Sequence, residues 1–188
     1  MQITYTPMAP REAALTRAES ARLLGVGRRH IDALVNNGWT TTGVSDIAAL
    51  AERQFVTSDS DLTIVRLGAP DYDTDGRRTG VDPNFTDAAL LESARQWWNG
   101  PIERALHSGH MLILTSTFII GLLALDSIED TIYPSPTLKR SAFNARLLAR
   151  VDDLVTSQTR VLEDHPLVET LGHRIKPIQA TPLTVIEP

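Results

Sequence analysis

The sequence predicts an α+β protein in which a domain of three helices precedes a mixed α/β domain with an antiparallel sheet or barrel. Apolar residues recur at helical spacing over residues 15–51, with glycines where the helices would stop. After Leu62 most apolar residues come in short continuous runs, as they do in buried strands. These two patterns place the helical domain at residues 1–60 and the mixed domain at residues 61–188.

Three helices are expected in the first domain. Thr16 and Glu19 have the spacing of a capping box, in which two side chains satisfy backbone N–H groups at a helix start. Gly25 is placed to end this helix in a left-handed conformation. A second helix is expected over residues 28–36, and Ser45 is expected to cap a third. The expected inward-facing residues are Ala18, Ala21, Leu23, Leu24, Val26, Ile31, Leu34, Val35, Ile47, Leu50 and Ala51.

The second domain is expected to mix strands and helices. Its polar segment 68–86 contains glycines and prolines and is expected to be a surface loop or the link between the domains. Thr86 is placed to cap a helix over residues 87–98, and a short helix is expected from Pro101. A polar helical segment is expected over residues 150–164. The expected strands are residues 62–67, 110–117, 118–126 or beyond, 141–148 and 183–187.

The composition is that of a soluble globular protein. Hydrophobic residues make up 42% and charged residues 22% of the 188, which argues against global disorder. The most apolar stretch, residues 111–125, is shorter than the roughly 20 residues that span a bilayer, so no membrane partner is expected. The chain has no cysteine, which excludes disulfides and thiolate metal sites, and its N-terminus has no apolar secretory run. We therefore expect a cytoplasmic protein.

Charge is unevenly distributed along the chain, whose formal net charge is −5. Residues 11–38 contain five arginines and three carboxylates, a net charge of +2, which leaves −7 for the rest. Because salt screens attraction beyond about 8 Å, the charge of the contacting face decides whether a polyanion binds. A face with about four or five cations is expected to bind weakly and salt-sensitively, since each neutralised phosphate adds about 0.9 to the salt slope.

The first domain carries a spaced set of residues: Leu15, Thr16, Glu19, Ala21, Leu24, Gly25, Val26, Arg28, Ile31, Leu34 and Gly38. This set resembles the helix-turn-helix of the MerR/excisionase type, whose pattern is L-T-x-x-E-A-A-x-x-L-G-V-S-R-x-T-V-x-x-L-x-x-x-G. The resemblance covers about 25 of the 188 residues. Gly27 replaces the usual serine, and His30 replaces the usual threonine. The segment WTTTGV, in place of the family's basic wing, has no lysine or arginine.

The resemblance implies binding to double-stranded DNA. In this motif the second helix enters the major groove, where an arginine can bond bidentately to guanine for about 1–3 kcal/mol of discrimination. Arg28 and Arg29 lie at the expected start of that helix, whose free N–H groups can also bind a phosphate. The alternative is a helical packing module with solvated arginines. The expected DNA-binding residues are Arg17, Arg22, Gly27, Arg28, Arg29, His30, Asn36, Asn37, Thr40 and Thr41.

The second domain has a tryptophan pair followed by Pro101 and Arg104, a hydrophobic hairpin expected to turn at Gly121, and Ala142-Phe143 on a strand. This order resembles the PUA-like barrels that include the EVE and ASCH domains. The resemblance implies RNA binding, or a flipped modified base held against aromatic side chains. The candidate aromatic walls are Trp97, Trp98, Phe118, Tyr133 and Phe143, and the alternative is that both tryptophans belong to the core. A second nucleic-acid contact is expected at Arg77, Arg78, Trp97, Trp98, His173, Arg174 and Lys176.

Residues 71–82, DYDTDGRRTGVD, have aspartates and a glycine at positions 1, 3, 5, 6 and 12 of an EF-hand calcium loop. Position 12 is Asp82, which is shorter than the usual bidentate glutamate, and position 8 is Arg78 where an apolar residue belongs. The preceding segment is also expected to be a strand and not a helix. We therefore expect a solvated loop and no metal site.

The sequence contains no glycine-rich phosphate loop, nucleophile elbow or HExxH motif. We expect a nucleoid-associated DNA-binding regulator of phage or bacterial type, or an excision-type accessory factor, and neither an enzyme nor a cofactor-dependent protein. Because one copy offers few cations, tight binding would need a homodimer, tandem sites or a second contact surface. The alternatives are a reader of modified or flipped bases and an interaction protein with no nucleic-acid partner.

Overall fold

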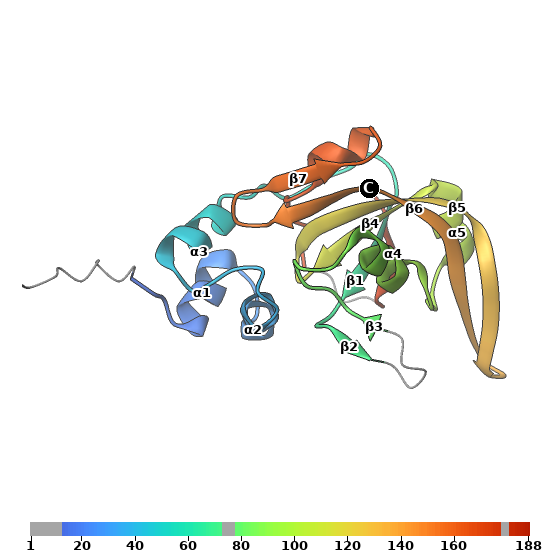
Figure 1. Cartoon of the computed structure of the whole chain (residues 1–188), viewed down its shortest axis with the longest axis horizontal. Coiled ribbons are helices and arrows are strands. Elements are labelled where there is room, and N and C mark those ends of the chain that lie inside the picture. Colours follow the sequence, from blue (N-terminus) through green and yellow to red (C-terminus); the bar gives the residue numbers. More distant parts are fainter. Residues whose placement is uncertain (1–12, 73–77, 178–180) are drawn as a thin grey trace, which may run out of the picture.

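The computed structural model describes residues 13–72, 78–177 and 181–188 of the chain. It has three helices at one end and a sheet with further helices at the other, so the expected α+β class is confirmed (Figure 1). We call residues 13–60 the head and residues 61–188 the body. No helix among the described residues is long and apolar enough to cross a membrane. The elements are α1 (Arg17–Leu24), α2 (Arg28–Asn36), α3 (Val44–Ala51), β1 (Leu62–Leu67), β2 (Asp71–Tyr72), β3 (Arg78–Thr79), α4 (Asp87–Arg95), α5 (Ile102–Ser108), β4 (His110–Thr115), β5 (Phe118–Ser135), β6 (Leu138–Asp153), β7 (Gln158–Val161), the 3-10 helix η1 (Pro166–Thr170) and β8 (Leu183–Ile186).

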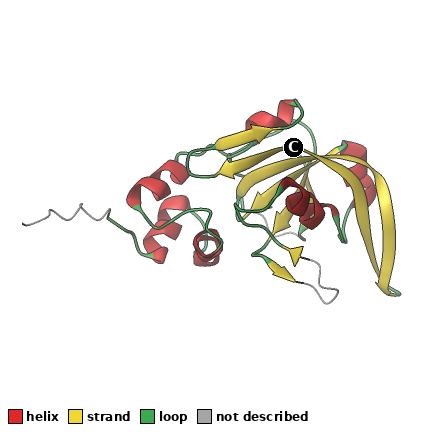
Figure 2. Cartoon of the chain, in the orientation of Figure 1, coloured by secondary structure: helices red, strands yellow, loops and turns green. Residues whose placement is uncertain are grey.

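The body is built on one sheet of six strands in the order β7-β6-β5-β4-β1-β8, which curls into a half-barrel (Figure 1). Neighbouring strands are antiparallel except β1 and β4, which are parallel and are connected through α4 and α5. The sheet is therefore mixed and not wholly antiparallel as expected. Helix α4 packs inside the curl, and β5 and β6 continue as a long hairpin on the side away from the head (Figure 2).

The head is built around its own apolar core. The capping box at Thr16 and the left-handed Gly25, with φ of 63°, both form as expected. Ala18 and Leu23 are exposed, contrary to expectation. The inner face of α1 consists instead of Ser20, Ala21 and Leu24. The buried core of the head is Ala21, Leu24, Ile31, Leu34, Trp39, Ile47 and Leu50, with Val26, Val35 and Ala51 partly buried against it.

Segment 150–164 is not helical, which corrects the expectation from its polar pattern. β6 continues to Asp153 and β7 follows after a turn, because this backbone pairs within the sheet and Arg150 lies opposite Gly121. Its many β-branched residues favour a strand once a pairing edge is present. The hydrophobic hairpin turns at Ser116, whose φ is 56°, and not at Gly121, which lies within β5.

Other boundaries also differ from the expected ones. α3 begins at Val44 with Gly43 as its N-cap, so Ser45 lies in the first turn and not at the cap. α4 ends at Arg95, so the tryptophan pair lies in the following loop. Segment 68–86 follows β1 inside the body and contains β2 and β3, so it does not link the head to the body.

Candidate nucleic-acid interface

α1 and α2 are held together by a polar contact across their solvent-facing sides. Arg17 Nη1 lies 3.1 Å from Asp32 Oδ1, and Arg17 Nη2 donates to Asn36 Oδ1 at 3.0 Å. Arg17 and Asn36 were both predicted to contact DNA, but here each bonds the other helix. The pairing also balances the charge of Asp32, which would otherwise repel a phosphate near α2.

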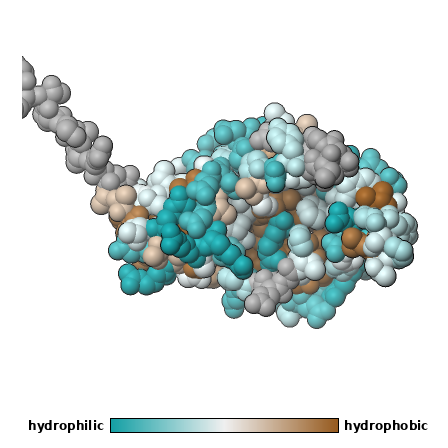
Figure 3. Space-filling view, turned by 90° about the horizontal axis from the view of Figure 1, so that it is seen from below, coloured by the Kyte–Doolittle hydropathy of each residue, from teal (hydrophilic) through white to brown (hydrophobic). Residues whose placement is uncertain are grey.

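The first turn of α2 projects two arginines into solvent. The side chain of Arg28 is 72% exposed, and its Nε lies 3.9 Å from Asp32 Oδ2, an ion pair too loose and exposed to hold it firmly. Arg29 is exposed as well, and so is Arg22 near the end of α1. The N-cap is Gly27, which has no side chain to satisfy the first amides of the helix. Hydrophilic side chains gather on this underside of the head (Figure 3).

His30 lies partly buried beside these arginines. Burial is the main reason why the pKa of His30 is below its ordinary value, and the charges of Arg29 and Arg66 lower it further. The imidazole is therefore mostly neutral at pH 7. Arg66 belongs to β1 of the body, so the positive potential around α2 comes from both parts of the chain. The effect of Arg66 on His30 could not be predicted from the sequence, because the strand pattern LTIVRL does not determine the tertiary neighbours of that strand.

The segment after α2 packs against α3 and forms no wing. Thr40 is 6% exposed, and its hydroxyl donates to the carbonyl of Thr41 at 3.2 Å. The Thr41 hydroxyl donates to Asp46 Oδ2 at 2.6 Å. Asn37 is half-buried, and its Nδ2 has no hydrogen-bond partner among the described residues. Thr40 is thus largely buried, whereas Thr41 is exposed and its hydroxyl is bonded at the start of α3.

The residues expected to form a second nucleic-acid contact differ in how far they are exposed. Arg174 is 3% exposed and therefore does not lie on the surface, which corrects the expectation. Trp98 packs against the core, and its Nε1 donates to the carbonyl of Ala94 at 2.6 Å. Trp97 is also partly buried. These contacts favour the alternative in which both tryptophans are packing residues.

The remaining members of that set are His173, Lys176, Arg77 and Arg78. His173 is half-buried and Lys176 is exposed, and both lie in the segment between η1 and β8. Arg77 lies outside the described residues, and Arg78 begins β3 with its side chain also outside them. Residues 73–77 of the acidic loop 71–82 lie outside the described residues too. Among the residues that the structure describes, no three side chains could hold a metal ion together.

The expected aromatic walls are also dispersed. Phe118 and Phe143 are fully buried, whereas Tyr133 is 66% exposed on the long hairpin. Together with the packed tryptophans, these side chains do not form one wall at which a flipped base could stack.

Arg174 joins the head to the body. Its guanidinium donates to the carbonyl of Leu24 at the end of α1, where the helix dipole favours a cation. It also lies over two aromatic rings, 4.5 Å from the centroid of Phe55 and 5.4 Å from that of Phe118. The backbone N–H of Arg174 donates to the carbonyl of Gln54 at 2.9 Å. Burial lowers the pKa of Arg174. These contacts fix how the head is oriented on the body.

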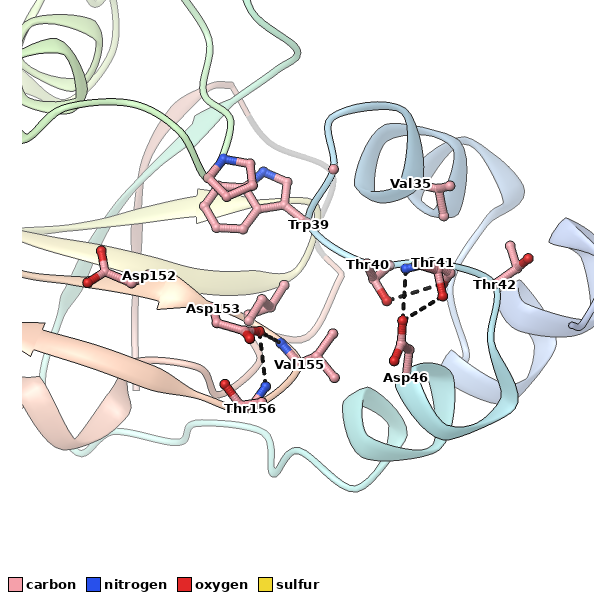
Figure 4. A pocket seen from close by; sticks show the side chains of 13 residues that line it. Val35, Trp39, Thr40, Thr41, Thr42, Asp46, Asp152, Asp153, Val155 and Thr156 are labelled. Atoms are coloured by element: carbon pink, nitrogen blue, oxygen red, sulfur yellow. Dashed lines mark hydrogen bonds between the residues drawn. The ribbon is translucent and has the colours of Figure 1, made fainter. Parts of the chain in front are cut away.

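A cavity of about 810 Å³ separates the head from the turn between β6 and β7 (Figure 4). Three aspartates line it, and each already has partners. Asp46 accepts from Thr41, Asp152 accepts from Arg160, and Asp153 accepts from two backbone N–H groups of its own turn. The hydrogen bond from Arg160 also lowers the pKa of Asp152. The cavity therefore presents carboxylates that are satisfied within the chain.

Comparison with known proteins gives no relative of this chain: no family model, no curated protein and no solved structure matches it. The candidate interface is a short helix with exposed cations at its first turn and no side-chain cap at its N-terminus.

Proposed function

We propose that the chain is a sequence-specific DNA-binding protein, most simply a transcriptional regulator, that inserts the first turn of α2 into the major groove. The observation that carries this proposal is the outward projection of Arg28 and Arg29 from that turn, beside the exposed Arg22. The major groove is wide enough for one helix, and an arginine at the helix tip can bond to the O6 and N7 atoms of guanine.

The packing around α2 supports such a docking. α1 contacts both α2 and α3 in the head, and the apolar residues of α2, Ile31 and Leu34, are fully buried beneath it. The helix is thus braced from behind while its first turn faces solvent. With Gly27 at the N-cap, the amides at the start of α2 can donate to a DNA phosphate.

The supply of cations limits how tightly one copy can bind. Arg17 is paired with Asp32, which leaves Arg22, Arg28 and Arg29 as the exposed arginines of this face of the head. Each phosphate that such a cation neutralises contributes about 0.9 to the slope of log affinity against log salt. A homodimer on two half-sites would double the number of cations that contact phosphates. Dimers of small groove-binding modules bind DNA in this way.

The test is selection of bound duplexes from a random DNA pool, using the full chain at low and at physiological salt. We expect one common sequence to be enriched, and its affinity to fall steeply and linearly on the logarithmic salt scale. A pool that stays random, together with no mobility shift at the lowest salt, would contradict the proposal. Enrichment of duplexes without a shared sequence would leave DNA binding but remove sequence specificity.

A further inference from the structure

Asp32 lies between two arginines on the solvent-facing side of the head. Its Oδ1 accepts from Nη1 of Arg17 at 3.1 Å, and its Oδ2 lies 3.9 Å from Nε of Arg28, one turn earlier in α2. The side chain of Asp32 is 39% exposed and that of Arg28 is 72% exposed. Because α1 holds its other oxygen, Asp32 has a defined position beside the first turn of α2, while Arg28 extends into solvent.

Arg17 holds this carboxylate group and the helix that carries it. Its Nη1 also donates to the backbone carbonyl of Asp32 at 3.5 Å, and its Nη2 donates to Oδ1 of Asn36 at 3.0 Å. Arg17 on α1 thus bonds two successive turns of α2, and its side chain is only 31% exposed. The side-chain bond to Arg17 uses Oδ1 of Asp32, so Oδ2 remains able to accept from Arg28.

The atom of Arg28 that faces Asp32 is Nε, which leaves the two terminal amino groups for another ligand. A guanidinium carries five N–H donors in a planar fork, and guanine O6 and N7 accept two of them side by side. The distance of 3.9 Å is longer than that of a charge-assisted hydrogen bond, about 2.7–2.9 Å, so the pair can close when Arg28 is ordered. Arg29 makes no ion pair with any residue that the structure describes, so it has no such support.

We propose that Asp32 is a positioning residue that orients Arg28 to read a guanine in the major groove. This inference rests on the proposed function. Nη1 and Nη2 of Arg28 donate to O6 and N7 of the guanine, and its Nε–H donates to Oδ2 of Asp32, which Arg17 holds in place. Asp32 touches no base. It reduces the number of orientations that Arg28 must lose on binding, and pre-organisation of this kind strengthens binding.

The experiment compares wild type with Asp32→Ala on the selected duplex, on the same duplex with each guanine replaced in turn, and on a random duplex. The preference for guanine at the position that Arg28→Ala ceases to read should fall by about two- to tenfold, the cost of ordering one long side chain. Affinity for the random duplex should not fall, because the substitution removes a negative charge. Asn36→Ala is the matched control and should change neither quantity, since it removes the other side-chain contact of Arg17 and leaves Asp32 in place.

The double variant Asp32→Ala with Arg28→Ala separates positioning of Arg28 from general bracing of α2. We expect it to discriminate at that position no worse than Arg28→Ala alone, because Asp32 acts only through Arg28. An additional loss, an equal loss in Asn36→Ala, or an unchanged preference in Asp32→Ala would overturn this inference and leave the proposed function intact. No DNA binding by wild type would remove the proposed function itself.

A measurement on wild type alone does not depend on how the variants fold. The Nε–H resonance of Arg28, assigned through its own side-chain carbons, should be broadened by exchange with water in the free protein, where the side chain is exposed. It should become sharp and protected when the selected duplex is added. A resonance that stays in fast exchange in the bound state would show that Nε–H is not bonded to Asp32, and would also overturn the inference.

Discussion

Replacing Arg28 and Arg29 together by alanine is expected to abolish sequence-specific DNA binding without unfolding the protein. Each guanidinium that bonds a guanine contributes about 1–3 kcal/mol of discrimination, so losing both should weaken the selected site by about thirtyfold or more. The effect on stability should be small, because both side chains project into solvent from the first turn of α2. Affinity is measured by gel shift at fixed salt, and the fold is checked by the thermal midpoint.

The chain offers a matched control for this double substitution. Lys139 and Arg140 are exposed near the tip of the long hairpin, away from the head (Figure 1). Lys139→Ala with Arg140→Ala removes the same number of positive charges from the same acidic chain. We expect its affinity to stay close to wild type, which separates a contact at α2 from a general effect of net charge. Equal losses in the two double variants would count against α2 as the docking element.

Substituting Arg150 by alanine is expected to destabilise the body by about 3–5 kcal/mol. The Arg150 side chain is 2% exposed and holds the segment before α4 onto β6. Its guanidinium donates to the carbonyls of Phe85 and Pro83, and its Nε lies 3.1 Å from Asp152 Oδ1 as an ion pair. Alanine would leave the buried carbonyl of Phe85 and the partly buried carbonyl of Pro83 without this donor, and it would open a cavity beside the sheet.

Arg160 is the control for Arg150, because it pairs with the same two carboxylates at the surface. It contacts Asp87 at 3.3 Å and Asp152 at 2.8 Å, but its side chain is 47% exposed. Exposed ion pairs contribute little, so Arg160→Ala should change the free energy of unfolding only slightly. Urea unfolding of both variants measures the difference. A loss below about 1 kcal/mol for Arg150→Ala would show that the buried guanidinium is not what holds the segment.

The parts of the fold that depend on neighbouring residues were predictable from the sequence. Thr16, Glu19 and Gly25 set the ends of α1 through contacts within a few positions, and the strand at residues 62–67 follows from a continuous apolar run. Segment 150–164 was not predictable in this way, since its polar pattern fits a helix until β5 offers an edge for pairing.

In the candidate interface too, features set by neighbouring residues were predictable and features set by tertiary packing were not. The exposed arginines at the start of α2 follow from the local motif, and the structure places Arg28 and Arg29 as the spacing predicts. Arg174 was expected at the surface because it belongs to a basic stretch of sequence. It is buried instead by groups that are far away in the sequence but close in space, namely the end of α1 and two aromatic rings.

Whether and where DNA binds can be tested on the 20.7 kDa chain by following the backbone amide resonances of the isotopically labelled protein as the selected duplex is added. We predict that the largest shifts fall on Gly27, Arg28, Arg29 and His30, and that the hairpin tip at Lys139 and Arg140 stays unchanged. Shifts confined to the hairpin or to the cavity between head and body, with the first turn of α2 unaffected, would contradict groove binding by this helix.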